Sequence, residues 1–267
     1  MLFLYNLSSV WMACIVVGVT LAFALIGYAI FRFCAPLHLD AEQRSMTISM
    51  VTVVTTINSL LIAFAAIGVW DAFNDADRIV TAEAACASEL ARDLATFGAP
   101  AADATGRILR LYLERVVHIE WPMMQQHAQF DPQTEQQFDA MFDAANRIEP
   151  TNPRQVVLLH EVLSRVNEME KYRQQRILIL DVAMPATLWG VILVVSGLSF
   201  GLLYVLPATR FHISLLSVWA VTLGLSIFFV LAVDRPFAGE VSVSSAPFQQ
   251  TIAELIASGT WSPELPH

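Results

Sequence analysis

The absence of charge over four long stretches constrains this chain more than any other feature. Asp, Glu, Lys and Arg are missing from residues 1–31, 45–70, 182–209 and 211–233. A helix needs about 20 apolar residues to cross a hydrocarbon core about 30 Å thick. Each stretch is long enough, so we expect an all-α membrane protein with four transmembrane helices in the lipid bilayer.

The charged residues gather between the second and third of these stretches. Residues 71–180 hold 17 acidic and 11 basic side chains, a net charge of −6 out of −9 for the whole chain. A nucleic-acid-binding domain carries a basic patch, so this acidic balance argues against a nucleic-acid partner. The sequence therefore predicts spans 1 and 2 in residues 1–70, a helical extramembrane domain in 71–181, spans 3 and 4 in 182–233, and a tail in 234–267.

Helix breakers predict where the spans begin and end. Pro36 follows the first uncharged stretch and stops its helix. The second span has no Gly or Pro at its end. One long helix is therefore expected to leave the membrane and to continue to about Gly98.

The middle domain has its own start and stop signals. Asp131 precedes a proline, which is typical of a helix N-cap followed by Pro at the first helical position. The Trp121–Pro122 step is expected to interrupt the helix that begins near Ala102. The helix that starts at Pro153 is expected to run straight into the third span.

The positive-inside rule predicts the orientation of the chain. Lys and Arg near the span ends number six on the side of the middle domain and tail, and three on the other side. The six are Arg78, Arg165, Lys171, Arg173, Arg176 and Arg235, and the three are Arg32, Arg44 and Arg210. Both termini and the middle domain are therefore expected in the cytoplasm.

The second span carries two contrasting faces. Small and hydroxylated residues recur every three or four positions, which places them on one helix face: Ser45, Ser49, Thr52, Thr56, Ser59, Ala63 and Ala66. The opposite face holds the bulky apolar residues Val54, Ile57, Leu61 and Phe64. Small residues let helices approach closely in a bilayer, so the first face is either a packing seam or the lining of a pore.

Each interpretation names different pore residues. A hydroxylated pore would be lined by Ser49, Thr52, Thr56, Ser59, Ala63 and Ala66. An apolar neck would instead be formed by Ile57, Leu61 and Phe64. Asp71 and Asp75 follow the span four residues apart. In a ring of subunits they would place carboxylates at a pore mouth, where charge influences ion preference; otherwise they are an ordinary solvated helix start.

Signals of catalysis and of metal binding are missing from the sequence. No HExxH, GxSxG, P-loop or GxGxxG motif occurs, and the three cysteines have no metal-ligand spacing. No ionisable Asp, Glu, Lys, Arg or His lies deep within a span, where a proton-coupled transporter or an intramembrane protease would normally need one. We therefore expect no enzyme, no cofactor and no metal. The Gly197–Gly201 pair forms a GxxxG motif that is expected to mediate a helix contact within the chain.

Three segments resemble a bacterial domain-of-unknown-function family described as bestrophin-like. The first contains Glu83, Arg92-Asp-Leu, Tyr112 and Glu120-Trp-Pro-Met; the second is Arg173–Ile177 with Pro185-Ala-Thr-Leu-Trp-Gly; the third is Asp234–Phe248. The third segment is the most specific. The resemblance extends from the second span to the tail.

The resemblance implies a homo-oligomeric channel for small inorganic ions in the bacterial cytoplasmic membrane. Bestrophins are pentameric anion channels with four spans per subunit, a neck lined by the second span and a Pro-Phe-Gly segment after the fourth. Pro236-Phe-Ala-Gly239 is similar to that segment but has one extra Ala. The acidic Asp71 and Asp75 depart from an anion-selective pattern. No acidic calcium-binding cluster follows Gly239, so calcium gating is not expected.

Two functions remain open at this point. The first is a passive oligomeric ion channel, with the second span around its axis. The second is a membrane-anchored interaction or signalling protein whose helical domain binds a partner. The tail motif of Asp234, Pro236, Phe237 and Gly239 fits either function, because a proline that ends a helix and a glycine that permits a reversal also make a structural clamp.

Overall fold

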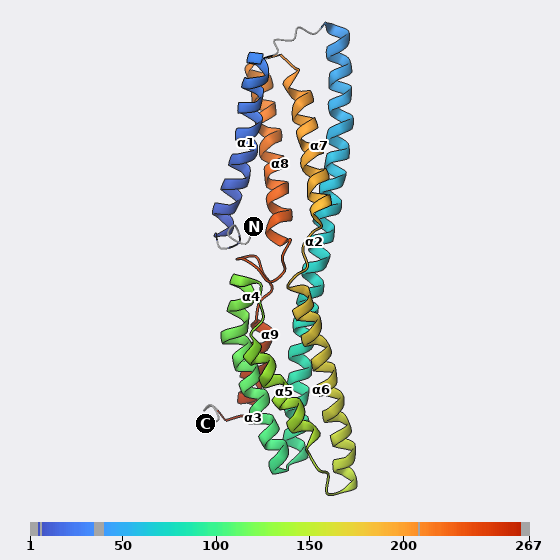
Figure 1. Ribbon diagram of the computed structural model, residues 1–267, viewed down its shortest axis with the longest axis vertical. Coiled ribbons are helices and arrows are strands. Elements are labelled where there is room, and N and C mark those ends of the chain that lie inside the picture. Colours follow the sequence, from blue (N-terminus) through green and yellow to red (C-terminus); the bar gives the residue numbers. More distant parts are fainter. Residues whose placement is uncertain (1–4, 6, 35–39, 208, 263–267) are drawn as a thin grey trace. The chain divides into compact units, whose positions relative to one another are not determined.

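The computed structural model describes residues 5, 7–34, 40–207 and 209–262. Every regular element among them is a helix (Figure 1), in agreement with the expected fold class. Pro36 and its predicted helix break lie outside the described residues. The chain folds into two compact units, which are described separately below.

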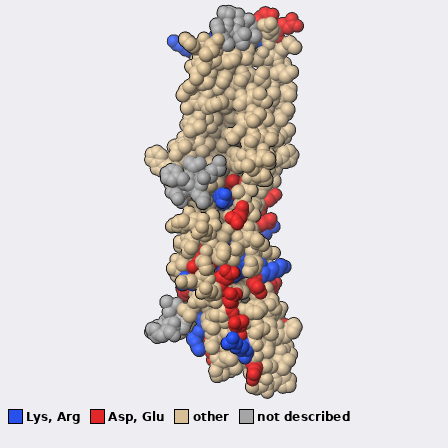
Figure 2. Space-filling model, viewed as in Figure 1, with Lys and Arg blue, Asp and Glu red and all other residues tan. Residues whose placement is uncertain are grey.

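The first unit, called the span unit, contains the apolar stretches. It comprises Met1–Ala72, Ala183–Arg235 and Gly239–Val241. Its helices are α1 (Ser9–Cys34), the first part of α2 (Ala41–Phe97), α7 (Ala186–Tyr204) and α8 (Arg210–Val233). All four helices are long and apolar enough to cross a membrane. In Figure 2 their visible surface carries no Lys, Arg, Asp or Glu between its ends.

Two glycines mark close helix contacts in the span unit. A Cβ added to Gly224 of α8 would lie 2.9 Å from the Cα of Val17 in α1, and one added to Gly27 of α1 would lie 2.9 Å from the Cζ of Tyr204 in α7. By contrast, a Cβ at Gly197 or Gly201 would meet no described atom within 4 Å. The predicted close helix contact is therefore absent at these two glycines among the described residues, contrary to the GxxxG prediction.

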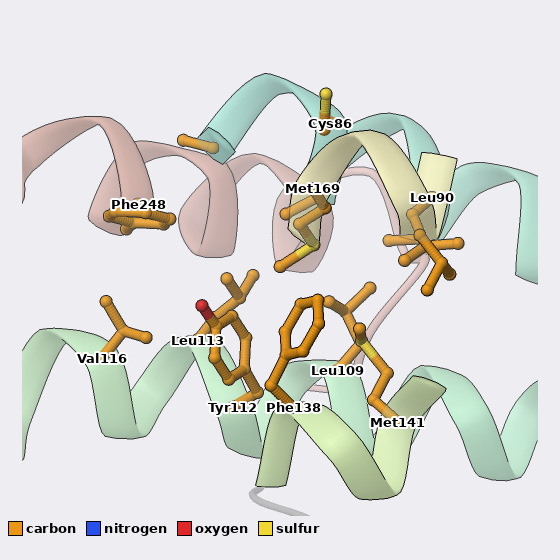
Figure 3. Close-up of a cluster of buried hydrophobic side chains, with 14 of the residues drawn as sticks. Cys86, Leu90, Leu109, Tyr112, Leu113, Val116, Phe138, Met141, Met169 and Phe248 are labelled. Atoms are coloured by element: carbon orange, nitrogen blue, oxygen red, sulfur yellow. The ribbon is translucent and has the colours of Figure 1, made fainter. Parts of the chain in front are cut away.

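The second unit, called the polar unit, comprises Phe73–Val182, Pro236–Ala238 and Ser242–His267. Its helices follow the end of α2 in the order α3 (Pro100–Arg115), η2 (Val116–Glu120), α4 (Trp121–His127), α5 (Pro132–Asn146), α6 (Pro153–Ile179) and α9 (Ala246–Ala257). Apolar side chains from these helices form one buried core (Figure 3).

The core follows from helical spacing. Leu109, Tyr112, Leu113 and Val116 recur at i, i+3, i+4 and i+7, and all four are fully buried. The predicted cap of α5 is also present, because the Asp131 carboxylate accepts hydrogen bonds from the first backbone N–H groups of that helix.

The predicted interruption at Trp121–Pro122 was wrong. A single π-helical segment, η2, joins α3 to α4 without a loop, and the backbone N–H of Trp121 donates to the Val116 carbonyl. Pro122 is the second residue of α4 and directly follows this π-helical segment. The loop begins only after His127.

The expected continuity of the last polar helix with the third span was also wrong. α6 ends at Ile179, and α7 begins at Ala186 after Pro185. A proline disfavours helical geometry in the residue that precedes it. That residue, Met184, donates its backbone N–H to Asp234 Oδ1 at 2.6 Å instead of to a helical carbonyl.

Candidate functional site

α2 packs in the span unit through a third face, which lies between the two faces recognised in the sequence. Its buried residues are Asn58, Ile62, Ala65 and Val69, with spacings of 4, 3 and 4. Asn58 is only 2% exposed, and its amide bonds to the hydroxyl of Ser196 on α7. This face turns toward the other spans of the same chain.

Both predicted pore faces are mostly exposed in the single chain. Ser49, Thr52, Thr56, Ser59 and Ala63 are exposed, and Ala66 is half-buried. On the apolar face Ile57 and Phe64 are 48% and 70% exposed, whereas Leu61 is half-buried. Exposure alone therefore leaves both faces available for a pore, for lipid or for another subunit.

The hydroxyl groups of α2 do not require water. Ser49, Thr52, Thr56 and Ser59 each donate to the carbonyl four residues earlier on the same helix. A hydroxyl satisfied in this way can face lipid or another helix without the cost of an unpaired polar group. The stripe is thus compatible with a packing seam as well as with a pore.

A groove runs beside part of the hydroxylated stripe. It has a volume of about 540 Å³ and lies between α2 and α8. From α2 it is lined by Ser59, Ala63 and Ala66 among others, and from α8 by Thr222 and Ser226 among others. The later part of the stripe therefore borders a neighbouring helix of its own chain.

The predicted pore-mouth carboxylates are both exposed. Asp75 forms an ion pair with Arg78 across 3.4 Å, with both side chains more than half exposed. Such a surface pair contributes little to stability, but it offsets the charge of Asp75. Asp71 carries no comparable ion pair among the described residues.

Two acidic residues in and beside the predicted tail motif contact the starts of spans. Asp234 accepts the Met184 N–H just before α7, as described above. Glu240 Oε2 accepts the backbone N–H of Ser9 at 2.6 Å and its hydroxyl at 2.8 Å, at the first residue of α1. Carboxylates at helix N-termini satisfy free N–H groups and favour the helix dipole. Gly239 lies between them at φ +83°, a conformation that favours glycine.

Pro236 and Phe237 of the same motif serve the polar unit. The carbonyl of Pro236 accepts the Val243 N–H at 2.8 Å, which closes the turn. The Phe237 ring is 3% exposed and meets Trp121 edge to face, with ring centres 5.7 Å apart. Both contacts lie within the polar unit.

The polar unit encloses a cluster of four charged side chains that are all 1% exposed or less: Glu83, Glu120, Arg173 and Arg176. Arg176 Nε donates to Glu83 Oε2 at 2.7 Å, and its Nη1 donates to Glu120 Oε1 at 2.8 Å. Arg173 Nη1 reaches the same Glu120 oxygen at 3.0 Å. Two positive and two negative charges thus neutralise one another.

Aromatic rings complete this buried charge cluster. Arg176 lies between Trp121 and Phe248, at 5.8 and 5.9 Å from the ring centres. Arg173 lies similarly near Tyr112 and Phe138, within the range of cation–π attraction. Burial alone would raise the pKa of Glu120, but the two guanidinium groups outweigh it and hold that pKa below its usual value. A carboxylate kept ionised and fully paired is suited to a structural role.

Sequence reasoning named most of these residues without grouping them. Glu83 and Glu120 appeared only as parts of the segments that carry the family resemblance, whereas Arg173 and Arg176 were also counted for the orientation of the chain. The pairing of Glu83 with Arg176 joins positions 93 residues apart. No local spacing rule links such positions, so their convergence required the fold.

Comparison with known proteins gives a family match. A family model described as Bestrophin-like domain matches residues 18–248. A search of curated protein sequences finds no match.

Solved structures show the same fold at low sequence identity. Two are single-substitution variants of a bacterial Bestrophin homolog from Klebsiella pneumoniae. One is 13% identical, covering 94% of this chain and 98% of that one with a TM-score of 0.59. The other is 10% identical, covering 91% and 97% with a TM-score of 0.59. A third, described only as a membrane protein, is 11% identical over 92% and 97% with a TM-score of 0.59.

Proposed function

Because the chain belongs to the bestrophin-like family, we propose that it forms a homo-oligomeric ion channel in the bacterial cytoplasmic membrane. The central path is lined by α2, and flux through it is passive. Bestrophin-like membership makes a pentamer the expected ring. The polar unit, which carries most of the charges, lies in the cytoplasm together with both termini.

The observation that carries this proposal is the exposed, uncharged outer face of α2. At about 100° per residue, Ser49, Thr56, Leu60 and Ile67 lie roughly half a turn around the helix from Asn58. Asn58 is buried against α7, whereas Ser49, Thr56, Leu60 and Ile67 are all exposed. In a ring with the other spans behind α2, this side faces the axis.

This arrangement takes residues from both faces recognised in the sequence. Ser49, Thr56 and Ala63 contribute small side chains to the path, while Ile57 and Phe64 flank it and narrow it. Ala63 borders both the path and the α8 groove, whereas Ser59 and Ala66 lie further around the helix toward that groove. Asp71 follows Ile67 after one helical turn, so its carboxylate lies at the mouth of the path.

Ion flux from liposomes tests the proposal. The purified chain should form a ring-shaped oligomer in detergent, and reconstituted vesicles should pass small ions. Thr56→Trp should remove most of the flux, because an indole on the axis-facing side blocks the path. Val218→Trp is the matched control, since Val218 is 64% exposed on α8, outside the proposed path.

The opposite results would favour the second function. A monomer without flux would contradict the channel and support a membrane-anchored interaction protein. Equal flux for Thr56→Trp and Val218→Trp would remove α2 from the path even if the chain conducts ions.

A further inference from the structure

α2 can present different residues to the proposed path if it rotates about its own axis. Thr56 and Ile57 are neighbours in sequence but lie about 100° apart on the helix. A rotation of that size would replace a mixed lining that includes Thr56 with one dominated by Ile57 and Phe64. The function proposed above therefore requires something that fixes the rotation of α2.

Most of the packed face of α2 cannot fix this rotation sharply. Ile62, Ala65 and Val69 are apolar, so they contribute packing but no hydrogen bond to a neighbouring span. The hydroxyl groups of Thr52, Thr55, Thr56 and Ser59 donate to carbonyls of their own helix and bond to no other helix in the described part of the chain.

Asn58 differs from these residues because it bonds to another span. Its Nδ2 donates to Ser196 Oγ at 3.1 Å, and the Ser196 hydroxyl lies 3.3 Å from Asn58 Oδ1. Asn58 is 2% exposed and Ser196 5% exposed, so the pair is largely enclosed by the span unit, with Asn58 also bordering the α8 groove. Among the described residues from Ala41 to Val69, Asn58 alone makes a side-chain hydrogen bond to another helix.

We propose that the Asn58–Ser196 hydrogen bonds fix the rotation of α2 and so select which of its residues face the ion path. A single buried asparagine fixes register in helical coiled coils by the same physics, because every other alignment leaves its amide unpaired. Asn58 is a positioning residue that does not touch the ion. The inference rests on the proposed function, since it concerns which face lines that channel.

Cysteine accessibility measures this rotation directly. In a background with Cys14, Cys34 and Cys86 replaced by alanine, single cysteines are placed at Thr56, Ser59 and Ile57. Oligomers in liposomes are treated with a charged, water-soluble thiol reagent, and the reaction rates are compared. With the native pair, Thr56→Cys should react fastest, because it alone among the three lies opposite Asn58.

Ser196→Ala should reduce the preference for position 56 by about three- to twenty-fold, the range expected for one interhelical hydrogen bond in a membrane. Ser196→Thr keeps a hydroxyl and should preserve the pattern. Ser199→Ala is the matched control, because Ser199 is equally buried on α7 but bonds to Val195 of its own helix. The oligomer is checked by size-exclusion chromatography in each case.

The outcomes separate the two proposals. If Ser196→Ala and Ser199→Ala both keep the native accessibility pattern, the positioning role is wrong while the channel stands. Asn58→Leu provides a second variant should Ser196→Ala fail to assemble, and an unchanged pattern there has the same meaning. If no position on α2 reacts and no ions pass, both the channel and the positioning role are wrong.

Discussion

The two units of this protein differ in how their cores hold polar groups. Within the spans, the buried contact between α2 and α7 is an uncharged amide–hydroxyl pair, Asn58 with Ser196. The core of the polar unit holds an arginine–glutamate cluster centred on Arg176, without measurable exposure. A charge at the bilayer centre is costly even when paired, whereas a helical domain can stabilise buried charges by pairing each with several partners. The difference predicts that the polar unit is the more sensitive to removal of one side chain.

The largest effect is expected from breaking the buried charge cluster. Arg176→Met leaves Glu83 and Glu120 buried without one of their partners, which should destabilise the polar unit by about 3–5 kcal/mol. Arg147→Met is the control, because Arg147 pairs with Asp143 on the surface and should cost about 0–1 kcal/mol. Denaturant unfolding of the full chain in detergent measures both. If both variants lost the same free energy of unfolding, burial of the charge cluster would not contribute to stability.

A smaller effect is expected from overpacking the span unit. Gly224→Ala forces a methyl group to within 2.9 Å of the Val17 backbone, and such crowding typically costs about 1–3 kcal/mol. Gly197→Ala meets open space and should stabilise the helix by up to about 1 kcal/mol. Thermal unfolding in detergent compares the pair. A loss at Gly197 in the assembled oligomer would reveal a contact with another subunit.

Ser196→Ala should lower the stability by less than Arg176→Met or Gly224→Ala. The lost bond to Asn58 is worth roughly 0.6–1.7 kcal/mol in a membrane protein. If Ser196→Ala lowered the free energy of unfolding by more than Arg176→Met does, the span unit would be the more sensitive of the two units. The same unfolding assay measures the effect, with Ser199→Ala as its control.

The smallest effect concerns acid. Burial alone would raise the pKa of Asp131, but hydrogen bonds from Arg115, Thr134 and Gln133 lower it below its usual value. A folded-state pKa that is depressed stabilises the fold above the unfolded pKa, about 3.9, and that stability is lost as the pH falls through the folded value. The lowered pKa of Glu120 likewise adds stability that is lost as the pH falls.

Asp131→Asn separates these two contributions. Asparagine keeps one acceptor oxygen for the cap of α5 but loses the charge pairing with Arg115 and the second carboxylate oxygen. The variant should therefore lose about 1 kcal/mol at neutral pH. Its stability should then fall less steeply than that of the native chain between pH 5 and 3. An identical slope would assign the acid sensitivity to Glu120 and the remaining carboxylates. Unfolding curves at stepped pH values provide the measurement.

The sequence predicted the helices correctly where the absence of charged residues, or of Gly and Pro, was sufficient to define them. Four uncharged stretches matched four apolar helices, and the absence of a breaker after Trp70 matched the single helix that ends at Phe97. Prolines were harder to interpret, because their effect depends on position in a turn. Pro122 was accommodated at the start of α4, whereas Pro185 separated two helices that were expected to be continuous.

The sequence by itself determined the class of this protein, because the transfer of charge into lipid is costly wherever the chain folds. It also determined the two exposed faces of α2, because helical spacing is a local property. Only the tertiary structure decided that α2 packs through Asn58 and that Glu83 and Glu120 pair with Arg176. Those choices depend on contacts between residues 56 to 138 positions apart, which no periodicity within one helix encodes.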